Sequence, residues 1–130
     1  MANRTISVAG IALIKRFEGC RLTAYKCSAG VWTIGYGHTS GVYAGMRITQ
    51  AQAEAFFQAD CRKFGSYVNN PAYVPQTEQL NQNQFDALVS FVFNLGPKWL
   101  KSLCDNGRTL AQIAAAMPQY RRAAGQVLPG

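Results

Sequence analysis

One stretch of the sequence, from Leu22 to Met46, combines glycines with β-branched and aromatic residues in a way that no other stretch does. The glycines that interrupt it are Gly30, Gly35, Gly37, Gly41 and Gly45. This composition is typical of a small twisted hairpin or a three-stranded sheet with glycines at the turns. A sheet of two or three strands is marginal in water by itself. The rest of the chain must therefore supply a surface for it to pack on.

Amphipathic helices are predicted on both sides of this stretch. Ser7 suits an N-cap before apolar residues at helical spacing, and the first helix should end near Glu18–Gly19. Thr49–Gln52 has the form of a capping box and opens a second helix. The prolines of Asn70–Pro71 and Val74–Pro75 then predict an extended connector.

Two further helices are predicted in the second half of the chain. One covers Asn81 to Asn94 and stops at Gly96–Pro97, and a shorter one opens at Thr109–Gln112 and closes at Pro118. The length fits one compact unit, residues 1–130. The expected fold class is α+β: mainly helical, with a small antiparallel sheet near the N-terminus and a cleft between the two parts.

The balance of charged residues limits the classes of molecule that the chain is expected to bind. The chain has 13 Lys+Arg against 6 Asp+Glu, a formal net charge of +7. Such a field attracts polyanions, including nucleic acid, anionic lipid and an acidic cell-wall polymer. The basic doublets Lys15–Arg16, Arg62–Lys63 and Arg121–Arg122 lie far apart, whereas nucleic-acid binding favours clustered basic residues. We therefore expect no nucleic-acid partner.

Neither a membrane span nor a metal site is predicted. No apolar run approaches the ~20 residues that a bilayer span requires, and the first residues lack the pattern of a signal peptide. The four cysteines have no CxxC spacing and His38 is the only histidine, so we expect no metal, no cofactor and no stable membrane insertion.

The candidate chemistry lies around Glu18. Phe17–Glu18–Gly19, Tyr25–Lys26–Cys27 and Thr33–His38 together form a pattern in which eight residues separate Glu18 from Cys27 and five separate Cys27 from Thr33. This pattern resembles the signature of the phage-type lysozymes, the endolysins of glycoside hydrolase family 24. Later blocks resemble the helices of the same family, and the resemblance extends from about Ser7 to Gly96. It implies a lysozyme-like fold and an enzyme that hydrolyses the β-1,4 bond between N-acetylmuramic acid and N-acetylglucosamine in peptidoglycan.

Glu18 suits the role of the general acid. Glycoside hydrolysis requires one group that protonates the leaving oxygen and a second group on the opposite face of the sugar. Packing between a helix end and the sheet, together with the helix dipole, should raise the pKa of Glu18, as an acid that works near neutrality needs. By resemblance, Cys27 replaces the family's Asp and Thr33 holds the attacking water or the sugar. A thiol is mostly neutral at pH 7, so Cys27 must be partly thiolate, helped by Lys26 or Arg21, or must act by positioning water.

The resemblance and the aromatic content suggest further site residues. The family pairs the histidine after the glycine-rich motif with an acid on the next helix, which implies an ion pair between His38 and Asp60. It also places a polar amide in the cleft at Asn94. Tyr25 and Tyr36 could stack on sugar faces, although aromatic residues in strands more often belong to the core.

The cysteines suggest a redox hypothesis. Cys20 and Cys27 flank the proposed acid, and a disulfide between them would remove the Cys27 thiol, although the sequence cannot establish the required geometry. Cys61 and Cys104 are expected to be core residues on helices.

The end of the chain departs from the family pattern. Family members continue past the Leu–Pro–Gly turn into an arginine-bearing helix, whereas this sequence stops at Val127–Gly130. We expect a monomer that waits in the host cytoplasm and then acts on the periplasmic cell wall. Two alternatives remain open: a peptidoglycan-binding module that has lost its chemistry, and a basic nucleic-acid binder.

Overall fold

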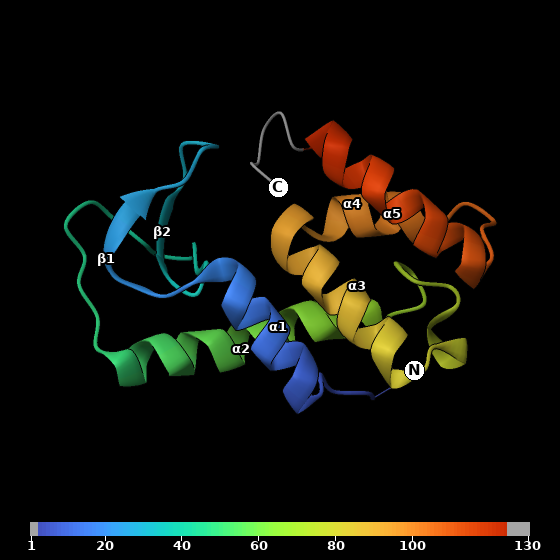
Figure 1. The fold of residues 1–130 in the computed structure, drawn as a ribbon, viewed down its shortest axis with the longest axis horizontal. Coiled ribbons are helices and arrows are strands. Elements are labelled where there is room, and N and C mark those ends of the chain that lie inside the picture. The colour runs from blue at the N-terminus through green and yellow to red at the C-terminus, as the bar shows by residue number, and fades with distance from the viewer. Residues whose placement is uncertain (1–2, 125–130) are drawn as a thin grey trace.

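The computed structural model describes residues 3–124. Its elements, in chain order, are α1 (Val8–Glu18), β1 (Arg21–Lys26), β2 (Trp32–Gly35), α2 (Gln50–Val68), a 3-10 turn at Thr77–Gln79, α3 (Gln82–Leu95), α4 (Pro97–Cys104) and α5 (Leu110–Ala124). The sheet forms one end of the molecule, α3, α4 and α5 form the other, and α1 and α2 run between them (Figure 1). The predicted α+β architecture is confirmed.

The helix starts follow from the capping residues. The Ser7 side chain accepts a hydrogen bond from the Gly10 N–H at the start of α1. Thr49 and Asn81 each form a complete capping box with the glutamine three residues later, at the starts of α2 and α3. These bonds satisfy backbone N–H groups that have no partner inside the helix. Local sequence therefore fixes where these three helices begin.

The sheet has two antiparallel strands among the described residues. Tyr25 pairs with Thr33 and Lys26 with Trp32, and an irregularity separates these pairs from the pair Arg21 and Gly35. A third strand does not form, although Thr23 makes an isolated bridge with Arg47. The prediction of a hairpin or a three-stranded sheet is thus resolved in favour of the hairpin.

Two apolar clusters underlie the two parts of the molecule. The larger cluster lies among the helices, and its fully buried members include Phe85, Phe91 and Leu100. The smaller cluster, Ile34, Ile48 and Ala53, lies between the sheet and the start of α2. The small sheet obtains the apolar support that it cannot provide itself.

The predicted stop at Gly96–Pro97 is confirmed, because α3 ends at Leu95 with Gly96 as its C-cap. The sequence analysis did not predict α4, which begins at Pro97; proline is well tolerated in the first turn of a helix. Two other expectations for the second half of the chain were wrong. Pro118 does not close the last helix, which runs through it to Ala124. The connector after Asn70 contains turns and a 3-10 turn where an extended segment was predicted.

The described part of the chain contains no helix that is both long and apolar enough to cross a bilayer. The segment Val127–Gly130, on which the expectation of a missing C-terminal helix rests, lies outside the described residues, as do the side chains of Arg121 and Arg122.

Candidate active site

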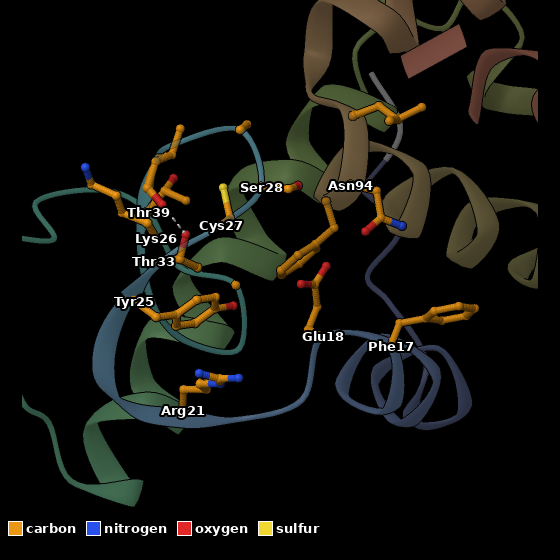
Figure 2. Close-up of a pocket in the computed structure, with 15 residues that line it drawn as sticks. Phe17, Glu18, Arg21, Tyr25, Lys26, Cys27, Ser28, Thr33, Thr39 and Asn94 are labelled. Carbon is orange, nitrogen blue, oxygen red and sulfur yellow. Dashed lines mark hydrogen bonds between the residues drawn. The ribbon is translucent and has the colours of Figure 1, made fainter. Parts of the chain in front are cut away.

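A cleft of about 780 Å³ lies between the hairpin and the helical part of the molecule. Its walls come from the end of α1, from β1 and the turn after it, from β2 and the residues that follow, and from the end of α3. Figure 2 shows the side chain of Glu18 projecting into this space, with Cys27 and Thr33 on one side and Asn94 on the other. The fold therefore brings together residues that are up to 76 positions apart in the sequence.

Glu18 is the last residue of α1, and Gly19 ends that helix. Gly19 has a φ of 64°, and its N–H donates to the Lys15 carbonyl at 2.9 Å. Burial raises the pKa of Glu18 from 4.5 to about 6. The expected increase in the pKa is thus present, and desolvation is its cause. A carboxyl with this pKa keeps its proton near neutrality far better than an exposed glutamate does.

Gly37 packs directly against the Glu18 carboxyl. A Cβ atom at Gly37 would lie 2.6 Å from Glu18 Oε2, and the backbone there has a φ of +75°. Only glycine adopts this conformation without strain and leaves room for the carboxyl. This close approach of backbone to side chain explains part of the desolvation of Glu18.

Cys27 lies at the end of the hairpin, just after β1. Burial raises the pKa of its thiol, but hydrogen bonds from the backbones of Val31 and Ala29 and from the Thr33 side chain outweigh it and lower the pKa below the ordinary value. The predicted help from Lys26 or Arg21 is wrong. Lys26 lies over the Trp32 ring and Arg21 over the Tyr25 ring, and the tight turn supplies the hydrogen bonds instead.

Thr33 is buried beneath the cleft, at 4% exposure. Its hydroxyl donates a hydrogen bond to the Val31 carbonyl at 2.9 Å. The same hydroxyl is close enough to Cys27 to affect the pKa of the thiol. A hydroxyl has one proton to donate, so Thr33 can donate a hydrogen bond to the Val31 carbonyl or to the Cys27 sulfur, but not to both at once.

The sequence model of the phage lysozyme family matches residues 15–130. The chain belongs to the phage lysozyme family.

Individual relatives agree with this membership. The chain is 45% identical over 130 residues to the endolysin of Lactococcus phage c2, across 96% of this chain and 54% of that protein. It is 52% identical over 91 residues to the endolysin of Acyrthosiphon pisum secondary endosymbiont phage 1, across 70% of this chain and 60% of that protein. The chain thus spans little more than half the length of these two endolysins.

Solved structures share the fold. The muramidase domain of SpmX from Asticaccaulis excentricus superposes with a TM-score of 0.67 at 36% identity, covering 95% of this chain and 80% of that chain. An endolysin from Escherichia coli O157:H7 phage FAHEc1 gives a TM-score of 0.65 at 35% identity, covering 97% of this chain and 75% of that chain.

Two of the three residues that were predicted to bind substrate line the cleft. Asn94 reaches it from α3, beside Phe93. Tyr25 reaches it from β1, where it pairs with Thr33 across the sheet, and burial together with the charge of Glu18 raises the pKa of its hydroxyl. Both residues are therefore accessible from the cleft.

The prediction that Tyr36 contacts the substrate is wrong, because Tyr36 lies outside the cleft. Its ring packs edge-on against Phe57 with centroids 5.3 Å apart, and its hydroxyl donates to Glu54 Oε1 at 3.1 Å. Strand alternation could have revealed this, since residues two apart share a face. Tyr36 is two residues after the buried Ile34, not after Thr33.

His38 and Asp60 lie together, as the family resemblance implied. His38 Nδ1 is 2.8 Å from Asp60 Oδ2, and both side chains are 12% exposed. The His38 ring also stacks on Phe56 with centroids 4.4 Å apart. The pair ties the segment after β2 to α2 and does not line the cleft.

The four cysteines are free thiols in this structure. Cys20 is exposed and its Sγ lies 3.7 Å from Gln50 Oε1, whereas Cys27 lines the cleft. The structure therefore contains no Cys20–Cys27 disulfide. Cys61 and Cys104 are buried as predicted, and desolvation raises the pKa of their thiols to about 11 and about 12.

Sequence reasoning missed two contributors to the site. Gly37 was interpreted as one of several glycines at turns and close backbone approaches, and its contact with Glu18 was not predicted, although its position in the motif shared with Thr33 was a usable signal. Phe93 also lines the cleft. No local pattern marks Phe93, because only the packing of α3 opposite the hairpin brings it to the cleft.

Proposed function

We propose that this chain is an endolysin-type muramidase, which hydrolyses the β-1,4 bond between N-acetylmuramic acid and N-acetylglucosamine in peptidoglycan. The observation that carries the proposal is the position of a desolvated carboxyl, Glu18, across one open cleft from a thiol whose pKa is lowered, Cys27. Membership of the phage lysozyme family supports it. A protein of this kind would break down the bacterial cell wall.

Glu18 acts as the general acid in this proposal. With a pKa of about 6, a substantial fraction of the side chain is protonated at slightly acidic to neutral pH. The carboxyl can then give its proton to the glycosidic oxygen as the bond breaks. A fully solvated glutamate would have lost nearly all of its protons at the same pH.

Cys27 and Thr33 act from the opposite side of the sugar. The partial negative charge of a Cys27 thiolate would stabilise the positive charge that develops on the sugar, or would orient the attacking water. Thr33 would hold that water through its hydroxyl. When the thiolate forms, the Thr33 hydroxyl can turn from the Val31 carbonyl and donate its hydrogen bond to the Cys27 sulfur instead.

Asn94 and Tyr25 bind the glycan in this proposal. Asn94 offers both a donor and an acceptor to the polar groups of the sugar, and the Tyr25 ring offers an apolar face. The net charge of +7 favours approach to a wall that carries acidic groups. The proposed partner is thus the glycan strand of peptidoglycan.

The cell wall is the proposed place of action. We propose that the enzyme acts as a monomer, held in the host cytoplasm before release and acting on the periplasmic peptidoglycan after it.

The test is the loss of turbidity of purified peptidoglycan, comparing the parent protein with Glu18→Gln in the presence of reductant. The released fragments are then analysed by mass spectrometry after borohydride reduction. We expect lysis by the parent, reduced N-acetylmuramic acid at the new ends, and at least a hundredfold slower lysis by the variant. Binding to peptidoglycan without turnover by the parent would refute the enzyme and favour a wall-binding module, whereas binding to DNA alone would favour a nucleic-acid partner.

A further inference from the structure

A polar cluster outside the cleft joins α1, α2 and the segment after β2. It consists of Lys15 on α1, Tyr36 just after β2, and Glu54 and Gln50 on α2. Lys15 Nζ lies 2.9 and 2.7 Å from the two Glu54 carboxylate oxygens. The Tyr36 hydroxyl donates to Glu54 Oε1 at 3.1 Å and accepts from Gln50 Nε2 at 3.0 Å.

Two members of this cluster lie beside the parts that surround the acid. Lys15 is three residues before Glu18 on the same helix, and its carbonyl accepts the Gly19 N–H that ends α1. Tyr36 directly precedes Gly37, whose backbone packs against the Glu18 carboxyl. Glu54 therefore bridges the helix that carries the acid and the segment that covers it.

We propose that Glu54, through Lys15 and Tyr36, is a positioning residue that holds the Gly37 backbone against the Glu18 carboxyl and so keeps water away from it. The inference rests on the proposed function of Glu18 as the general acid. Glu54 does not line the cleft and does not touch substrate in this scheme. It acts only by fixing the distance between α1 and the segment after β2.

Direct charge effects do not account for the raised pKa of Glu18. Burial alone raises its pKa to about 6, without a contribution from Lys15 or Glu54. The titratable groups that share the cleft with Glu18 all lie on β1 or next to it: Arg21, Tyr25, Lys26 and Cys27. The other residues that line the cleft from the end of α3 and from the segment after β2 carry no charge: Phe93, Asn94 and Leu95 on α3, and Gly37 and Thr39 after β2. Loosening the Gly37 segment should thus change the hydration of Glu18 rather than its charged neighbours.

Three variants separate positioning from charge. Tyr36→Phe removes the bond to Glu54 but keeps the ring that packs on Phe57. Lys15→Met removes a positive charge, so a direct charge effect would raise the pKa of Glu18, whereas hydration would lower it. Glu54→Ala removes the bridge itself, because alanine has no acceptor for the Lys15 and Tyr36 side chains. Lys101→Met is the matched control, because it breaks a lysine–acid pair at the end of α4, where Lys101 Nζ lies 2.6 Å from Oδ2 of the C-cap residue Asp105.

The measurement is a pH titration of the Glu18 side-chain carboxyl by NMR in protein labelled with ¹³C-glutamate. The chain has only three glutamates, and Glu18→Gln assigns the signal. We expect the pKa of Glu18 to fall by half a unit or more in all three variants and to stay unchanged in the control. Each half unit lowers the protonated fraction at pH 7 by about threefold. The value of kcat should fall by the same factor, with KM unchanged and the alkaline limb of the pH profile moved to lower pH.

The inference is overturned if folded Tyr36→Phe and Lys15→Met proteins keep the parent's Glu18 pKa, or if Lys15→Met raises it. The titration needs no substrate, so its result does not depend on lysis. Absence of lysis by the parent would count against the proposed function alone. Normal lysis together with an unmoved Glu18 pKa would count against the positioning role alone.

Discussion

Adding one methyl group at Gly37 should disable the site without unfolding the protein. A Cβ there would lie 2.6 Å from Glu18 Oε2 and 3.0 Å from Glu18 Cδ, and φ is +75°. Gly41 is a matched control, since its φ is +71° and a Cβ would meet nothing within 4 Å. Both alanine variants bear the same backbone strain, but only Gly37→Ala meets the carboxyl.

The expected magnitudes separate stability from activity. The strained backbone costs about 1–2 kcal/mol in either variant, which lowers Tm by roughly 3–6 °C in a domain of this size. Ordinary van der Waals contact begins near 3.4 Å, so the carboxyl at 2.6 Å must move by about 0.8 Å, the difference between the two distances. The carboxyl ends a flexible side chain and can move at little cost to folding. A displacement of about 1 Å at a reacting group can cost on the order of a hundredfold in rate.

The assay combines thermal unfolding followed by circular dichroism with the initial rate of peptidoglycan lysis at pH 6. We expect equal losses of Tm in the two variants, and a kcat for Gly37→Ala that is about 30- to 100-fold below that of Gly41→Ala. Equal rates in the two folded variants would refute the reasoning, because the close contact would then have no influence on the acid.

Three further predictions concern ionisable groups. The pKa of Glu18 is raised from 4.5 to about 6 on folding, so its contribution to stability is fully present below pH 4.5 and is lost as the pH rises through 6. Urea unfolding should therefore show that Glu18→Gln is more stable than the parent by about 1 kcal/mol above pH 7, after allowance for solvent screening. The difference in the free energy of unfolding should vanish below pH 4.5. A difference that stays constant with pH would contradict this prediction. In native protein at pH 7, iodoacetamide should alkylate Cys27 and leave Cys61 and Cys104 intact, because the pKa of the first thiol is lowered and the other two are buried with raised pKa values; peptide mass spectrometry, with urea-unfolded protein as the control, checks the order. Asp60→Asn should lower the free energy of unfolding by roughly 1–3 kcal/mol through the loss of a charge-assisted hydrogen bond, and an unchanged urea midpoint would show that the pair with its histidine contributes nothing.

Much of the helical framework could be predicted from the sequence. Ser7, Thr49 and Asn81 marked the starts of α1, α2 and α3, because a capping side chain bonds to N–H groups only two or three residues away. The hairpin was equally visible in its glycines and β-branched residues. These features depend on neighbours in the chain, so no knowledge of tertiary contacts was needed.

Prolines misled the prediction of the later helices. Pro97 was interpreted as a stop, although proline is as suitable for starting a helix as for ending one. Pro118 lies inside α5, where packing of residues such as Ile113 and Ala116 in the core maintains the helix. Tertiary contacts therefore maintain α5 through Pro118, whereas the start of α4 at Pro97 follows from a local preference of proline.

The sequence by itself named the residues of the candidate site, through a motif that resembles that of a known family. The spacing of Glu18, Cys27 and Thr33 along one helix end and one hairpin left little freedom in where the three side chains could lie. Only the tertiary structure decided the state of those groups. The pKa of Glu18 is raised because burial, to which the Gly37 backbone contributes, desolvates its carboxyl. The pKa of Cys27 is lowered because a tight turn directs hydrogen bonds at its sulfur, and Tyr36 faces α2 rather than the cleft. Desolvation and hydrogen-bond geometry depend on atoms brought together across the fold, and no pattern along the chain records them.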